Sequence, residues 1–243
     1  MDERKEGFGH FYKRWLSQHH DLLHRLLRPS EPPNISLTDK SCQDQQYKAL
    51  IDEVVSHYRQ YFQEKSNAAK QNPCLVFNPP WLTPIERAFL WISDFKPSLL
   101  FRLLNVSVSD LSPEQYERLA AVKDETTREE RTLSDAIARV QETAAAPPLV
   151  DLVRTIGRLA NVESFDFLSA IDAYKESVLV AMEKADSLRR STGMEMMEIL
   201  RPAQCVKFLA AALKLQLDVR RWGLEKEAQS ADPLKSTQAQ YRS

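Results

Sequence analysis

The stretch LSPEQYERLAAVKDETTREERTLSDAIARVQETAAA, residues 111–146, decides the fold class of this chain. It opens with a helix start, because Ser112 is a suitable N-terminal cap, Pro113 takes the first helical position, and the side chain of Gln115 can bond back to the cap. A Pro-Pro pair ends the stretch. The sequence therefore predicts one long helix around residues 112–146, about 50 Å in length at about 1.5 Å per residue.

Glycine is scarce throughout the chain, with 5 residues among 243, where average usage would give roughly 17. Rossmann and P-loop phosphate sites need several closely spaced glycines, and turn-rich β proteins also use many. The composition therefore predicts an all-α protein. A formal net charge of −1 gives no global field that would hold nucleic acid or an anionic membrane. No apolar run approaches the roughly 20 residues of a membrane span.

Apolar side chains repeat at helical spacing on both sides of the opening stretch. The predicted helices span about residues 6–27, 44–71, 149–160, 164–190 and 202–227. Another helix start is marked by Thr83, with Pro84 in the first helical position and Glu86 three residues after the cap. We expect these helices to form a single multi-helix bundle.

The expected bundle covers residues 1–228 as one domain, with a polar, proline-bearing linker at about 29–43 and a flexible tail at 229–243. The three cysteines are odd in number and lack a C-x-x-C pattern, so we expect reduced thiols. The first ten residues lack the apolar core of a secretory signal. These features favour residence in the nucleus and/or the cytoplasm.

The string HHDLLH, residues 19–24, comes close to the zinc-protease pattern His-Glu-x-x-His. His20 and His24 lie away from the apolar face of the predicted helix, Asp21 is shorter than the usual general base, and no third ligand follows. We therefore expect surface histidines, which remain candidates only for an adventitious metal or haem contact. His19 should point inward as a neutral imidazole with one hydrogen-bond partner. We expect no metal, no cofactor and no catalytic residue.

Large aromatic residues are the predicted core, and truncation of a buried tryptophan should cost about 3–5 kcal/mol. They are Trp15, Trp81, Phe89, Trp91, Phe95 and Trp222. Five of them, all except Trp15, together with Phe101 leave open an apolar pocket between helices that would hold an acyl chain or a similar ligand.

Two charged segments are the candidate partner surface of the protein. The first is the polar middle of the long helix, and the second lies near the end of the last helix. They comprise Arg128, Glu129, Glu130 and Arg131, and Arg220 and Arg221. A solvated face is the simpler interpretation of the first segment.

Four blocks in order resemble the plant delay-of-germination domain. They read FYKRWLSQHHDLLHRLL, WLTPIERAFLWISDFKPSLLFRLL, LSPEQYERLAAVKDETTREERTLSDAIARVQE and ILRPAQCVKFLAAALKLQLDVRRWG. The resemblance covers about residues 8–224. The same domain forms the C-terminal part of TGA-type bZIP transcription factors.

Two departures from the family pattern bear on local structure. Arg201 precedes Pro202 where the family usually has Thr or Ser, so that helix start lacks the usual side-chain cap. In WISDFKP, Ser93 and Asp94 replace two family glycines, so we expect no tight backbone approach there.

The chain enters the domain within about ten residues, without the basic helix and leucine zipper of a bZIP reader. It is therefore similar to the stand-alone members, which the resemblance implies are non-enzymatic regulators in seed dormancy, hormone signalling and development. Implied partners are protein phosphatases, bZIP factors or a second copy of the chain. Two alternatives stay open: a sensor for a small apolar or haem-type ligand, and direct sequence-specific DNA binding.

Overall fold

The computed structural model describes residues 3–28, 37–145 and 165–231. In these ranges every regular element is a helix, and the only β feature is an isolated bridge between Trp91 and Asp94. The prediction of an all-α protein is therefore confirmed. The helices are α1 (Glu3–Leu26), α2 (Leu37–Gln71), α3 (Pro73–Phe77), α4 (Pro84–Ala88), α5 (Leu99–Ser107), α6 (Pro113–Ala145), α8 (Phe165–Ile199) and α9 (Pro202–Ala231).

The helix starts that the sequence marks are present. The amide of Gln115 donates to Ser112 Oγ at 3.2 Å, and the Ser112 amide donates to Gln115 Oε1 at 3.0 Å. This reciprocal cap starts α6, as predicted. Thr83 and Glu86 form the same kind of capping box at the start of α4, although that helix is only five residues long.

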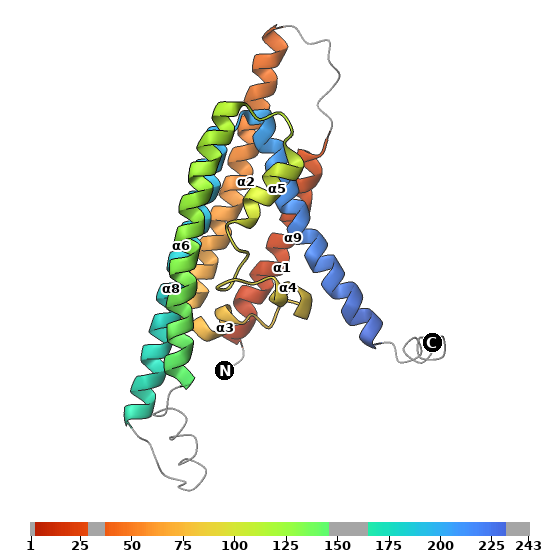
Figure 1. Ribbon diagram of the computed structural model, residues 1–243. Helices are drawn as coiled ribbons and strands as arrows, with labels where there is room; N and C mark the ends of the chain where they lie inside the picture. The colour runs from red at the N-terminus through yellow and green to blue at the C-terminus, as the bar shows by residue number, and fades with distance from the viewer. Residues whose placement is uncertain (1–2, 29–36, 146–164, 232–243) are drawn as a thin grey trace, which may run out of the picture.

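The long helices form two groups (Figure 1). Antiparallel α6 and α8 pack along their length, and the hydroxyls of Thr126 and Thr192 meet at 3.1 Å between them. Helices α1, α2 and α9 pack on one another, with α5 and α4 against α9. Contacts between α2 and α8 are few, so the two groups approach each other only locally along these helices.

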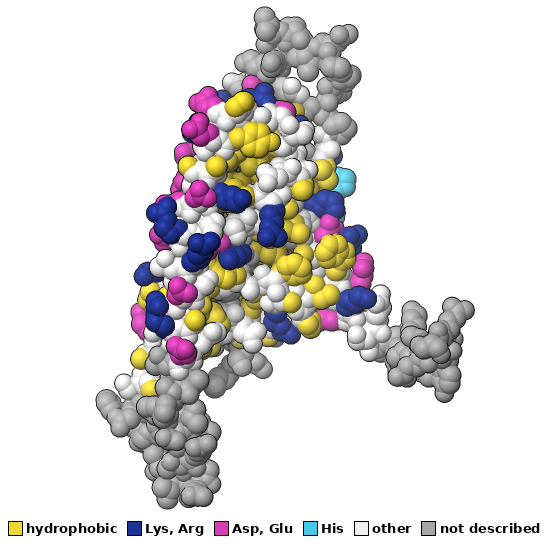
Figure 2. Space-filling model, in the orientation of Figure 1, with side chains coloured by type: hydrophobic (Ala, Val, Ile, Leu, Met, Phe, Trp, Pro, Cys, Tyr) yellow, Lys and Arg dark blue, Asp and Glu magenta, His cyan; other side chains and the backbone are white. Residues whose placement is uncertain are grey.

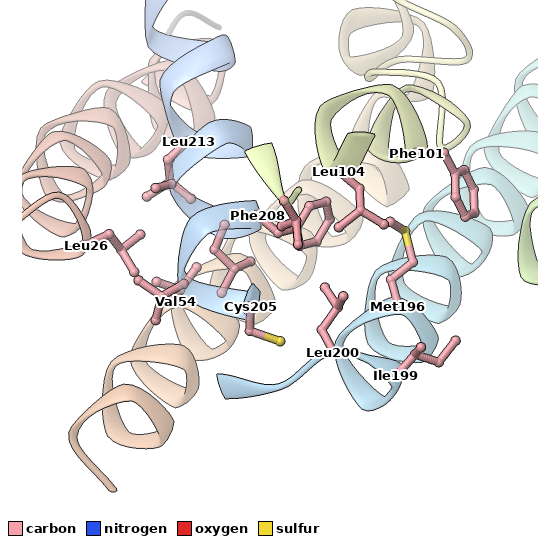
Figure 3. Close-up of a cluster of buried hydrophobic side chains, with 14 of the residues drawn as sticks. Leu26, Val54, Phe101, Leu104, Met196, Ile199, Leu200, Cys205, Phe208 and Leu213 are labelled. Atoms are coloured by element: carbon pink, nitrogen blue, oxygen red, sulfur yellow. The ribbon is translucent and has the colours of Figure 1, made fainter. Parts of the chain in front are cut away.

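The main apolar core joins the two groups where α9, α5 and the end of α8 meet (Figure 3). Val54 of α2 and Leu213 of α9 are fully buried. Burial of side chains of this size contributes about 1.5–3 kcal/mol each. Figure 3 labels Leu26, Val54, Phe101, Leu104, Met196, Ile199, Leu200, Cys205, Phe208 and Leu213.

Not all of the predicted aromatic core lies inside. Trp15 is 1% exposed and stacks on the His57 ring at 4.6 Å, while its indole nitrogen donates to the His57 carbonyl. Three others, Trp81, Trp91 and Phe95, are partly buried.

The prediction was wrong for Phe89 and Trp222, which are 47% and 46% exposed. Phe89 ends the short α4 and so projects beyond it. On α9, Val219 and Gly223 face the protein; Trp222 lies about 100° around the helix from Gly223 and therefore meets solvent.

Several predicted boundaries need correction. The polar linker at 29–43 is too long, because α2 begins at Leu37, and helix α8 continues beyond residue 190 to Ile199. Helix α9 extends to Ala231, so residues 229–231 of the expected tail are helical. The expected helix at 149–160 and the rest of the tail lie outside the described residues.

Candidate functional site

A tight turn between α4 and α5 is the first component of the site. The Trp91 amide donates to the Asp94 carbonyl at 2.7 Å, and Ile92 and Ser93 take φ values of 46° and 66°. The expectation of no tight approach without glycine was therefore wrong. Left-handed backbone costs non-glycine residues about 1–3 kcal/mol each, so other contacts must stabilise this turn.

Arg189 of α8 supplies these contacts. Its guanidinium donates to the carbonyls of Ile92 at 3.0 Å and Asp94 at 3.2 Å, and also to that of Trp91. A fourth bond reaches the Phe95 carbonyl at 2.7 Å. One buried side chain thereby fixes the turn to the α6–α8 pair.

Lys65 of α2 connects the same turn and the same helix. Its ammonium lies 2.8 Å from Asp186 Oδ1 and 3.3 Å from Asp94 Oδ2, and its side chain is only 2% exposed. Asp186 also accepts from Arg189 at 2.5 Å. We call Lys65, Asp94, Asp186 and Arg189 the buried ion network. It carries two positive and two negative formal charges.

The network keeps Asp94 ionised. Burial alone would raise the pKa of the Asp94 carboxyl, but Lys65 and Arg189 outweigh burial and hold that pKa below its usual value. Tyr61 donates to Asp94 Oδ2 at 2.8 Å. Burial, followed by the negative charge of Asp94, raises the pKa of Tyr61, so this phenol stays protonated.

A groove of about 840 Å³ opens beside the buried ion network, between α2 and α8. Apolar side chains of α5 and α9 line its inner part, including Leu100, Phe208 and Leu215. On α8, Val180 and Met194 line the groove and are 39% and 44% exposed. We call this the α2–α8 groove. It is an apolar surface that the described part of the chain leaves uncovered.

A second tight contact fixes α9 to α4. A Cβ placed on Gly223 would lie 2.0 Å from Thr83 Oγ1, so only glycine fits against the α4 cap. Arg220 pairs with Glu86 at 2.7 Å and donates to the Trp81 carbonyl at 2.9 Å. Its side chain is 17% exposed, so the prediction of Arg220 as a partner surface was wrong: its charge serves the fold.

The predicted charged surface on α6 likewise contains both exposed residues and a buried one. Arg128, Glu129 and Arg131 are exposed, and Figure 2 shows acidic and basic side chains mixed along the side of the molecule that α6 forms. Glu130 is 1% exposed and accepts from the Ser98 amide at 2.6 Å, so its assignment to a partner surface was wrong. The exposed Arg221 pairs with Asp218 on its own helix.

The histidines of α1 lie on different faces of the helix, exposed or buried as their positions predict. His20 and His24 are exposed, with ring centres 6.0 Å apart. Within the described ranges, no three His, Cys, Asp or Glu side chains are grouped so that they could hold a metal ion. His19 is fully buried and its Nδ1 lies 3.2 Å from His57 Nε2. Burial, followed by His57, lowers the pKa of His19 to about 3, so the imidazole is neutral.

Sequence reasoning missed the buried ion network. Lys65 continues the inward stripe of Val54, Tyr58 and Tyr61 on α2, and a lysine at such a position was the one available signal.

The described helices include none long and apolar enough to cross a membrane.

The fold places the chain among all-α helical-bundle domains, and comparison with known proteins makes the class specific. A family model described as seed dormancy control (DOG1) matches residues 18–106. The Arabidopsis thaliana protein RESPONSE TO ABA AND SALT 1 is 35% identical, and the match covers 88% of this chain and 94% of that protein. Protein ZW2 from Arabidopsis thaliana is 34% identical, over 90% of this chain and 97% of that protein.

A transcription factor also matches. Rice TGA2.3 is 29% identical over 84% of this chain, and the match covers 59% of that factor. The chain belongs to the plant seed dormancy control (DOG1) family. This family includes relatives named for abscisic acid and salt responses and is related to TGA transcription factors, so its role is regulatory.

Proposed function

We propose that the protein is a non-enzymatic regulator that binds other proteins in hormone, seed-dormancy or developmental signalling, linked to transcription. The observation that supports this most is the end-to-end similarity to RESPONSE TO ABA AND SALT 1, combined with the similarity of the same domain to part of TGA2.3. A domain that occurs both alone and within transcription factors is suited to joining regulatory proteins. bZIP factors, protein phosphatases or a second copy of the chain are the proposed partners, and the nucleus is the proposed main location.

The exposed charges support the same proposal. Arg128, Glu129 and Arg131 project from the side of α6 that faces away from the buried core. Arg221 projects from α9. Charges at the edge of an interface guide encounter and select partners more than they add affinity, so charge reversal is the appropriate perturbation.

Affinity purification from plant tissue tests this function. The variant carries Arg128→Glu, Arg131→Glu and Arg221→Glu, and Lys70→Glu at the exposed end of α2 is the matched control. We expect wild type and the control to recover the same partners, and the triple variant to lose at least one of them. Retention of every partner by the triple variant would contradict the proposed surface, and recovery of no partner by wild type would contradict the proposed function.

A further inference from the structure

We propose that the α2–α8 groove binds an amphipathic helix of a partner protein, with the apolar face of that helix inward and acidic residues toward the rim. This inference rests on the proposed function, because it assigns to a partner-binding protein the site and the chemistry of one partner.

The length of the groove fits a helix. Its lining runs from Val54 to Ala69 on α2 and from Val180 to Met197 on α8. At about 1.5 Å per residue each wall is about 25 Å long, which equals about 16 residues of a third helix. Helices bind in such grooves through apolar residues at steps of three and four.

The interior of the groove is apolar and adaptable. Phe208, Leu209 and Leu215 of α9 line it, and they belong to the body of the protein rather than to its rim. Met194 and Met197 line the α8 wall. Methionine side chains adjust their shape readily and are common on surfaces that accept the apolar face of a helix.

The rim of the groove is basic. Three exposed basic residues line the groove, namely Arg59, Lys184 and Arg190. Glu183 is the one exposed acidic residue of the groove lining. In the described part of the chain none of the three basic residues pairs with a carboxylate. Arg190 extends over the Phe62 ring at 5.9 Å, from the α8 wall to the α2 wall.

The acidic residues deeper in the groove do not offset this charge. In the buried ion network Lys65 pairs with the carboxylates of both Asp94 and Asp186, and Arg189 also pairs with that of Asp186. The free charge that meets a ligand is therefore positive. Charge complementarity selects an acidic helix rather than a basic one.

Gly193 allows the groove to be filled without disturbing the fold. It lies on the α8 wall, and a Cβ at this position meets no atom within 4 Å. Gly193→Trp therefore places a large ring in the groove and should also favour the helix, since glycine is a poor helix former. Gly7 of α1 also has no atom within 4 Å of a Cβ and does not line the groove, so Gly7→Trp is the matched control.

The test is a selection of phage-displayed random 16-residue peptides on the full chain, followed by fluorescence anisotropy of the enriched peptides. We expect enriched peptides with net negative charge and apolar residues at helical spacing. Gly193→Trp should weaken their binding at least tenfold, and Gly7→Trp should leave it unchanged. The double variant Arg59→Glu, Lys184→Glu should also weaken it at least tenfold, and its binding should not weaken further as salt increases, unlike that of wild type.

Three results would overturn the proposal: enrichment of no peptide, enrichment of basic peptides, or equal binding by Gly193→Trp. Native mass spectrometry of protein from plant tissue supplies another arm. A bound small apolar molecule that Gly193→Trp excludes, together with no enriched peptide, would assign the groove to that ligand instead. Continued recovery of partners in the affinity purification would then leave the proposed function standing, so the two failures can be told apart.

Discussion

Substitution of Lys65 by methionine tests whether the buried ion network holds the two groups of helices together. Methionine keeps most of the length of the lysine side chain and removes the charge, so Asp94 and Asp186 lose their shared ammonium at 3.3 and 2.8 Å. The Coulomb energies of these two contacts are about 5 and about 6 kcal/mol at an effective dielectric constant of about 20.

The net loss is smaller than the sum of these contacts, because desolvation of the lysine already opposes them and Arg189 remains beside Asp186. Removal of one partner from a buried ion pair costs about 3–5 kcal/mol. Lys65→Met should therefore lower the free energy of unfolding by about 3–5 kcal/mol. In a chain of this length the melting temperature should fall by roughly 6–20 °C.

Urea unfolding followed by circular dichroism at neutral pH measures this loss, with Lys184→Met as the control. Lys184 is exposed on the same α8 helix that carries Asp186, so its substitution should change the free energy of unfolding by less than about 0.5 kcal/mol. If Lys65→Met is as stable as Lys184→Met, the network does not stabilise the fold and the reasoning fails.

Four further substitutions test local features. Gly223→Ala should destabilise the protein by about 1–3 kcal/mol, because its Cβ would lie 2.0 Å from Thr83 Oγ1. Gly193→Ala is the control: its Cβ meets no atom within 4 Å, so this variant should have a higher melting temperature than wild type. Equal melting temperatures of the two variants would refute the packing argument. Ser93→Gly should stabilise the protein by about 1 kcal/mol, because glycine adopts a φ of 66° without strain and the variant lacks a hydroxyl that is buried without a partner in the described residues. Urea unfolding measures this gain, and a lower free energy of unfolding than that of wild type would contradict the expectation. The pKa of His19 is lowered from 6.5 to about 3. The contribution of the neutral imidazole to the free energy of unfolding is therefore fully present above pH 6.5 and is lost as the pH falls toward 3. By pH 5 the contribution of His19 to this decline should be about 2 kcal/mol, and His19→Gln should remove that contribution; an unchanged profile would contradict neutral burial.

The sequence could predict features that depend on neighbouring residues. Ser112 and Gln115 are three positions apart, and their reciprocal bonds start α6 as expected. The inward position of His19 likewise follows from its place on the apolar face of α1. Phe89 and Trp222 show where this reasoning fails, because their exposure depends on how α4 and α9 meet at Gly223.

The site depends on contacts that a single sequence does not specify. Lys65 meets Asp94 and Asp186 across 29 and 121 positions of the chain. A lysine within an apolar stripe indicates that a buried partner exists, but many carboxylates could serve. The α2–α8 groove is harder still to predict, because it is defined by the distance between two helices that touch only locally.

Proximity labelling in living plant cells tests the central claim most directly, which is that this fold regulates by binding partners in the α2–α8 groove. Wild type, Gly193→Trp and Gly7→Trp are compared at equal abundance. The account predicts a set of labelled proteins shared by wild type and Gly7→Trp, from which groove partners are missing in Gly193→Trp. An identical labelled set for all three proteins would contradict it.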